Sequence, residues 1–130
     1  MINTLLAELT QEAATTRRVL ERLPSDKLKW RPHPKSRTLG DASPTTVLDE
    51  SLASARAALA AMSDERLGEM WSMMAGGTVL VAMPRVALLR SIMLNHWYHH
   101  RGQLSVYLRE LDVPVQSIYG PSADENPFMP

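Results

Sequence analysis

The feature that most constrains this sequence is a histidine-rich stretch set within a long helical pattern. Residues 94–104 hold three of the four histidines in the chain. Around them, similar side chains recur at steps of three and four residues, which is the spacing of one face of an α-helix. The members of this face are Leu89, Met93, His96, His100, Gln103, Tyr107 and Leu111. The pattern predicts one helix over residues 84–111, with imidazoles and an amide on its otherwise apolar inner side.

The histidine spacing indicates a metal site. Side chains four residues apart on a helix have Cβ atoms about 5–6 Å apart, so His96 and His100 can direct two imidazole nitrogens at one ion. His99 flanks the same face and can replace His100 or support the site from the second layer of contacts. We expect a divalent transition metal, Zn²⁺ or Ni²⁺, because imidazole suits both ions. The alternative is a buried histidine cluster that is hydrogen-bonded to neighbouring side chains.

Two further long helices are expected before this one. An apolar stripe predicts a first helix over residues 2–23, and Pro24 ends it because proline cannot continue the hydrogen-bond ladder. Ser43 and Pro44 form a typical helix start. An alanine-rich stripe then continues to Met62, which predicts a second helix that a neighbouring helix can approach closely.

The remaining segments are expected to be short or irregular. Residues 63–74 predict a cap and a short helical turn, and residues 78–83 an extended connector. From residue 114 to residue 130 the chain is expected to be a tail that packs on the helices. The sequence therefore predicts a single all-α domain over residues 1–130.

The outer side of the last helix carries an apolar patch where charge would be expected. Leu94, Trp97 and Tyr98 lie away from the histidine face on a helical projection. An exposed apolar patch of this kind usually marks a partner surface. Because three helices leave apolar stripes without a facing surface, we expect an up-down bundle that a second copy of the chain completes, so that the protein is a homodimer with this patch as its contact.

Composition excludes several classes of function. Lys plus Arg and Asp plus Glu balance at 14 each, and no basic excess favours nucleic-acid binding. The chain has no cysteine, which fits a cytoplasmic protein without a disulfide framework. No apolar run is long enough to span a membrane, so we expect no membrane partner.

Several segments resemble one known family. Residues 96–104, 107–111 and 119–125 resemble the closing segment of the DinB family, also called the DinB/YfiT-like metalloprotein fold, and residues 19–24 and 30–37 resemble its first helix and the turn that follows. The resemblance implies a four-helix bundle with a three-histidine site for a divalent metal. Two of its ligands match His96 and His100, and the third comes from the second helix of the bundle.

The resemblance also implies that one helix is missing. The family's second helix follows a stretch that matches Leu39, Gly40 and Asp41. Here Asp41 runs directly into a segment that resembles the start of the next helix, so the second helix and its histidine are absent. What the family implies is a metal-dependent thiol S-transferase or hydrolase acting on a small-molecule or thiol substrate. The alternative is a non-catalytic helical scaffold with a degenerate metal site, and the sequence leaves open whether the chain is an enzyme.

Overall fold

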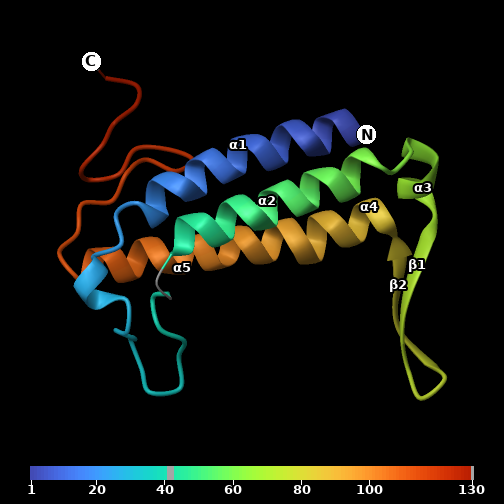
Figure 1. The fold of residues 1–130 in the computed structure, drawn as a ribbon, viewed down its shortest axis with the longest axis horizontal. Coiled ribbons are helices and arrows are strands. Elements are labelled where there is room, and N and C mark those ends of the chain that lie inside the picture. Colours follow the sequence, from blue (N-terminus) through green and yellow to red (C-terminus); the bar gives the residue numbers. More distant parts are fainter. Residues whose placement is uncertain (41–42, 130) are drawn as a thin grey trace.

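The computed structural model describes residues 1–40 and 43–129, and its framework is three long helices lying side by side (Figure 1). Asp41, on which part of the family resemblance rests, lies outside the described residues. The elements in order are α1 (Ile2–Leu20), η1 (Ser25–Lys27), α2 (Pro44–Ala60), α3 (Asp64–Gly68), β1 (Met70–Ala75), β2 (Thr78–Pro84), α4 (Arg85–Leu88), η2 (Leu89–Leu94) and α5 (Asn95–Glu110). None of the helices within these described ranges is long and apolar enough to cross a membrane.

The α1 helix supplies the central apolar stripe of the bundle. Its buried members include Leu5, Leu9 and Val19, at the spacing of one helix face. The helix ends before the predicted residue 23 because its last turn tightens: the Arg22 N–H donates to the Val19 carbonyl oxygen at 3.1 Å, and the Leu23 N–H donates to that of Leu20 at 3.1 Å. Such three-residue bonds are typical where a helix stops.

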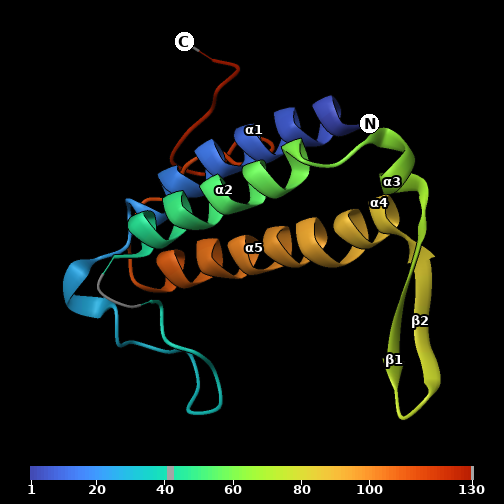
Figure 2. The ribbon, with the colours of Figure 1, turned by 45° about the vertical axis from the view of Figure 1, so that its right-hand side comes forward.

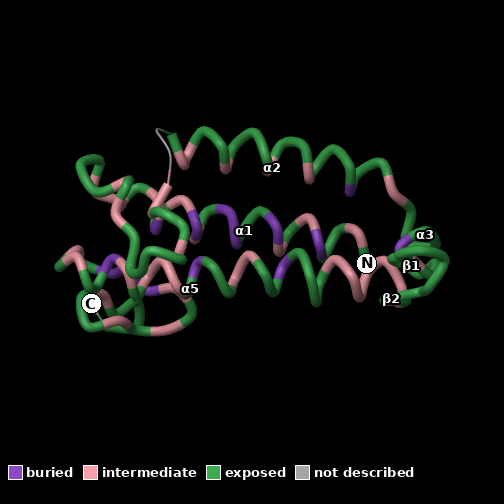
Figure 3. The backbone as a smooth tube through the Cα atoms, turned by 90° about the horizontal axis from the view of Figure 1, so that it is seen from below, coloured by how far each residue is buried: buried purple, intermediate pink, exposed green. Residues whose placement is uncertain are grey.

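The core is divided into two clusters along α1. The larger contains Leu5, Leu9, Leu59, Leu67 and Leu94, and the smaller contains Val19, Leu108 and Val115. The α2 helix buries only Leu59 fully, and Figure 3 shows most of its length exposed. This helix therefore leaves much of its predicted apolar stripe half-covered.

A β-hairpin corrects the prediction of an all-α fold. The strands β1 and β2 pair antiparallel, with Met70 opposite Pro84 and Ala75 opposite Thr78. The linking residues Gly76 and Gly77 both have positive φ, 54° and 82°, which a tight hairpin turn requires. The predicted cap at Ser63 and the short helical turn are present as α3 (Asp64–Gly68), and the predicted extended segment is β2. The prediction that the turn continues to residue 74 was wrong, because Met70–Ala75 is a strand and a Gly-Gly pair between two apolar runs is itself a hairpin signal.

The face of the last helix that enters the core also differs from the prediction. Leu94 is only 2% exposed and lies in the core, and Trp97 and Tyr98 pack half-buried against the same cluster. His96 and His100, by contrast, are exposed. The patch expected to bind a partner is therefore part of the chain's own core, and the histidine face points outward.

The π-helix η2 (Leu89–Leu94) explains this reversal. The segment from α4 through η2 to α5 runs without a break, close to the predicted 84–111. Within η2 the hydrogen bonds join residues five apart, so each turn takes up more residues than an α-turn. A seam counted in steps of three and four across Leu89 and Met93 therefore passes to another face before it reaches His96. Burying Trp97 and Tyr98 is also more favourable than burying imidazoles.

Two arms project from the bundle on the same side. The hairpin β1–β2 leaves one end and the loop of residues 31–39 leaves the other, as Figures 1 and 2 both show. At the loop end the C-terminal tail crosses back over α1 and α5, where Val115 and Ile118 join the smaller core cluster. The end of the tail does not pack on the helices in the same way, since Phe128 is 76% exposed.

Candidate metal and ligand site

The α5 helix brings His96 and His100 together, nitrogen to nitrogen. The two Nε2 atoms lie 2.7 Å apart, and the ring centroids are 4.5 Å apart. On its other side, His100 Nδ1 lies 2.9 Å from Gln103 Oε1. Because an amide oxygen only accepts, Nδ1 of His100 carries the proton. In neutral His100 the Nε2 atom then has a free lone pair, which accepts the hydrogen bond from His96 Nε2–H.

This arrangement fits two ligand positions of a divalent ion. Imidazole nitrogens bind zinc at about 2.0–2.1 Å, so two tetrahedral ligands lie about 3.3 Å apart. The observed 2.7 Å is the spacing of a hydrogen bond. Since both rings are exposed, a small side-chain rotation can open the pair. Gln103 meanwhile fixes the tautomer of His100 that leaves Nε2 available, as metal-ligating histidines require.

The third predicted ligand, His99, lies beside the pair without joining it. Its ring packs edge-on against that of His100, with centroids 5.2 Å apart and planes at 73°. Within residues 1–40 and 43–129, no three His, Cys, Asp or Glu side chains gather as a metal-binding group. The structure thus brings two of the three predicted ligands together, and metal binding by them stays a prediction.

A pocket of about 360 Å³ opens next to His100. One wall is α5 and the other is the loop of residues 31–39; the lining residues are Ser36, Arg37, Thr38, Leu39, His100, Gln103, Leu104 and Tyr107. The size is that of a small-molecule site. The sequence alone missed this pocket, because the loop reaches α5 only through the fold. The one local signal was its pair of prolines, Pro32 and Pro34, which hold the loop extended.

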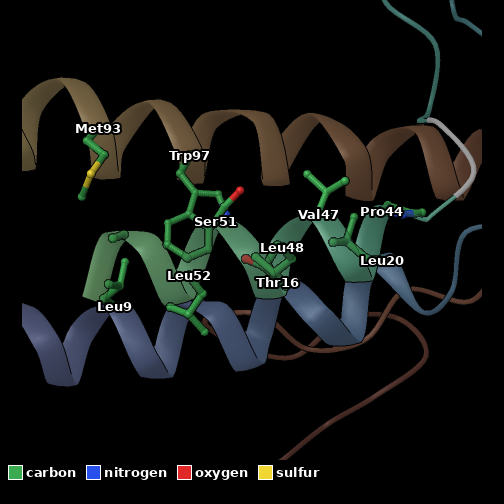
Figure 4. Close-up of a pocket in the computed structure, with 11 residues that line it drawn as sticks. Leu9, Thr16, Leu20, Pro44, Val47, Leu48, Ser51, Leu52, Met93 and Trp97 are labelled. Carbon is green, nitrogen blue, oxygen red and sulfur yellow. The ribbon is translucent and has the colours of Figure 1, made fainter. Parts of the chain in front are cut away.

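A second, apolar groove of about 420 Å³ lies between the three long helices (Figure 4). Leu9 and Leu20 of α1 and Leu52 of α2 line it, together with Met93 of η2 and Trp97 of α5. Met93 is three residues before His96 along the helix, so the groove and the histidine pair occupy adjoining faces of α5.

A buried ion pair fixes α5 against α1. The Arg101 side chain is 1% exposed and its Nη2 lies 2.6 Å from Oε2 of Glu12. Arg101 also donates to the Tyr119 hydroxyl and to Thr16 Oγ1, the latter at 3.2 Å. Burial, followed by the hydrogen bond to Glu8, raises the pKa of Tyr98 well above its usual range. Because Arg101 is the next residue after His100, its contacts with Glu12, Thr16 and Tyr119 set how α5 presents the histidine pair.

The pKa of Tyr119 is raised in the same way. Desolvation of its hydroxyl is the main cause, although the residue as a whole is 68% exposed, and the hydrogen bond that this hydroxyl donates to Glu12 Oε2 at 3.0 Å is the next. Tyr119 therefore stays protonated and remains a donor near neutral pH. The tail is thus joined to the Arg101–Glu12 pair through a neutral phenol.

Fold and site together define a class: a helical bundle whose last helix carries an outward histidine pair beside a ligand-sized pocket. The chain belongs to the DinB family, whose sequence model matches residues 43–127. The match begins at α2, just after the point where the sequence predicts the missing helix.

One curated relative supports this assignment. The chain is 42% identical over 43 residues to "Uncharacterized protein YrdA" of Bacillus subtilis (strain 168), and the aligned segment is 33% of this chain and 25% of that protein. The similarity therefore spans a quarter of the relative's length. The relative's name assigns it no activity.

Proposed function

We propose that the chain binds a divalent transition metal, Zn²⁺ or Ni²⁺, through His96 and His100, and acts in the cytoplasm as a metal-dependent thiol S-transferase or hydrolase. The observation that carries the proposal is the convergence of two Nε2 atoms at 2.7 Å with Gln103 behind one of them. A bound ion would supply Lewis-acid activation of a thiol or water. The chain's own residues hold the two imidazoles in place and offer a pocket for a small molecule beside them.

A second function is favoured by the small number of ligands. In the described residues only two imidazoles converge, so the remaining coordination positions depend on water, on His99 or on another chain. Two protein ligands hold an ion less firmly than the three or four of known zinc sites. The alternative is therefore a non-catalytic scaffold of the same fold with a degenerate metal site.

Metal titration tests the first part of the proposal. We expect Ni²⁺ and Zn²⁺ to bind the metal-free protein, and His96→Ala or His100→Ala to lower the affinity at least tenfold, since each removes a ligand. Gln103→Ala should lower the metal affinity about 10-fold or more, because removing the hydrogen-bond partner of a ligating histidine typically has an effect of that size. Calorimetry at pH 7.5 and at pH 5.5 measures both affinity and its loss on acidification, which follows because imidazole binds metal only when neutral.

His99→Ala is the matched control, since it removes an exposed imidazole from the same turn of α5. Equal binding by His96→Ala, His100→Ala and the unchanged protein would place the metal elsewhere. A metal-loaded protein that neither hydrolyses p-nitrophenyl acetate nor transfers a small thiol to an electrophilic dye would favour the scaffold. Turnover that requires both added metal and His96 would favour the enzyme.

We propose further that two copies of the chain assemble as a homodimer. The apolar groove between α1, α2 and α5 supports this, because an uncovered apolar surface in a small bundle favours association. The hairpin β1–β2 adds a second uncovered apolar surface. The contact is no longer expected at Leu94, Trp97 and Tyr98, which lie in or against the chain's own core.

A further inference from the structure

The charge of this chain is unevenly distributed around the pocket at His100. The protein has equal numbers of basic and acidic residues, yet residues 27–40 contain five basic residues and no acidic one. The five are Lys27, Lys29, Arg31, Lys35 and Arg37. Among the residues that the structure describes, the last four form no ion pair, whereas Lys27 lies 3.9 Å from Asp26. Residues 27–40, which include the loop of residues 31–39, therefore carry a concentrated positive charge beside the pocket.

The fold holds this loop in a defined shape. At its base the Leu39 N–H donates to the Trp30 carbonyl oxygen at 3.0 Å, and the Gly40 N–H donates to that of Leu28 at 3.2 Å. At its tip the Ser36 N–H donates to the His33 carbonyl oxygen at 2.8 Å. These bonds close the segment between Trp30 and Leu39 into a compact loop.

An aromatic contact fixes the loop against α5. The ring of Trp30 packs edge-on against Tyr107, with centroids 5.8 Å apart. Tyr107 also lines the pocket. The loop wall of the pocket is therefore positioned by packing as well as by hydrogen bonds.

Arg37 is the one basic side chain of this loop that lines the pocket. In the described residues it forms no ion pair, whereas other arginines do: Arg85 pairs with Glu69 at 2.5 Å, and Arg109 with Asp124 at 2.5 Å. A guanidinium without a carboxylate partner at the wall of a pocket offers a planar set of donors that matches carboxylate and phosphate oxygens. The hydroxyl residues on either side of it, Ser36 and Thr38, line the pocket too.

We propose that this pocket binds the oxyanion of a small molecule, a carboxylate or a phosphate, through Arg37. Ser36 and Thr38 supply additional donors, and the rest of the molecule lies along α5 between Tyr107 and His100. At about 360 Å³ the pocket holds a small anionic molecule and not a polymer. Its role in a reaction rests on the proposed function, because His100 joins the two sites; anion binding itself requires no metal.

The test uses two simple probes on the full chain in the presence of a chelator. Succinate and inorganic phosphate are titrated at constant ionic strength, and binding is followed by NMR shifts of the backbone amides of Thr38 and Leu39 and of the Gln103 side-chain amide. We expect saturable shifts with at least one probe, and Arg37→Gln to weaken that binding about tenfold, the effect of losing a charge-assisted hydrogen bond. Saturation by succinate alone identifies a carboxylate substrate, and saturation by phosphate alone a phosphate ester.

Arg66→Gln is the matched control. Arg66 is exposed on α3, and its side chain forms no ion pair with any described residue, so it reports the loss of one positive charge far from the pocket. If Arg37→Gln and Arg66→Gln weaken anion binding equally, or if residues 36–39 show no saturable shift, the proposed anion site is wrong and the loop is only a solvated basic segment. Because metal is absent throughout, that failure is separate from a failure of the His96–His100 titration.

Discussion

At the scale of single residues, the pair Arg101–Glu12 governs how α5 sits on α1. The arginine is nearly inaccessible, with 1% of its side chain exposed, and the glutamate has 10%. Glu12 makes three polar contacts. Arg101 pairs with its carboxylate and donates to its backbone carbonyl oxygen, and the Tyr119 hydroxyl donates to the same carboxylate. Removing one partner of such a buried pair leaves the other charge buried without compensation, which destabilises the fold.

Removing Glu12 should therefore destabilise the fold strongly. We expect Glu12→Ala to lower the free energy of unfolding by about 3–5 kcal/mol, because Arg101 would stay buried without its counter-charge. Urea denaturation followed by circular dichroism measures this change. The double variant Glu12→Leu/Arg101→Met should recover much of the loss, since it leaves no buried charge.

The exposed pair Arg17–Asp49 provides the comparison for that experiment. Asp49→Ala breaks an ion pair with more than a third of each side chain exposed, and should cost less than about 1 kcal/mol. If Glu12→Ala and Asp49→Ala cost the same, burial does not strengthen the Arg101–Glu12 pair.

The histidine pair shows what sequence spacing can and cannot give at this scale. Four-residue spacing on a helix predicted that His96 and His100 would meet, and their nitrogens do lie 2.7 Å apart. The same spacing carried no information on exposure, which depends on how the whole helix is rotated. The role of Arg101 was missed because its partners, Glu12 and Tyr119, are 89 and 18 residues away in the chain and meet it only in the folded state.

At the scale of elements, the rotation of α5 depends on η2 (Leu89–Leu94). Periodicity predicted the length of the combined helix closely, because an uninterrupted apolar repeat is a strong signal. It could not predict the local change to π-helix, because a pattern counted in steps of three and four residues assumes an unbroken α-helix. The consequence was a reversed face, with Trp97 inside and His96 outside.

The C-terminal tail is held by carboxylates. The Arg109 guanidinium, which donates at 2.5 Å, holds the pKa of Asp124 below its usual range, and the Val115 N–H adds to this effect. The Ser117 N–H, which donates to Glu125 at 2.7 Å, lowers the pKa of that carboxyl, with Arg18 as the second cause. Both groups are thus more acidic in the folded state than in the unfolded chain.

Acid should therefore release the tail. A carboxylate whose pKa is lower in the folded state than in the unfolded chain stabilises the fold at any pH above its unfolded-state pKa. That contribution is lost as the pH falls through its folded-state pKa. For Asp124 and Glu125 the loss should begin below about pH 4. We expect Asp124→Asn/Glu125→Gln to melt at a lower temperature than the unchanged protein at pH 7, and the difference to shrink as the pH falls below about 4.

Melting curves between pH 3 and pH 7 measure this convergence. Glu110→Gln is the control, because among the described residues that exposed carboxylate forms no ion pair. A difference in melting temperature that persists unchanged at pH 3 would mean that the two carboxylates act through their shape and not through their charge.

At the scale of the whole molecule, two apolar surfaces are left uncovered among the residues that the structure describes. One is the groove between α1, α2 and α5, and the other is the hairpin β1–β2. The sequence predicted that three amphipathic helices would leave apolar surface without a facing partner, but it placed that surface at Leu94, Trp97 and Tyr98, which lie in or against the chain's own core. It did not predict the second, since residues 63–74 were expected to be helical, and strand pairing depends on contacts across the Gly76–Gly77 turn.

The hairpin has the properties of an association arm. It carries no charged residue between Met70 and Pro84, although exposed strand edges are usually protected by charge. Five of its apolar side chains are largely exposed: Met70 at 60%, Met73 at 42%, Met74 at 54%, Val79 at 53% and Leu80 at 56%. An isolated two-stranded hairpin is only marginally stable in water. A second copy would supply a partner, because the unpaired edges of two such hairpins can pair about a two-fold axis.

We therefore expect the protein to be a homodimer at micromolar concentration, with the hairpin in the contact. Light scattering measures the mass, and Val79→Lys should shift it towards that of the monomer, because the new charge lies on an exposed apolar strand. Val106→Lys is the control, since Val106 is similarly exposed, at 56%, on α5. A monomeric unchanged protein would refute the dimer. If Val106→Lys dissociates it and Val79→Lys does not, the two copies meet along α5, close to the histidine pairs, and not at the hairpin.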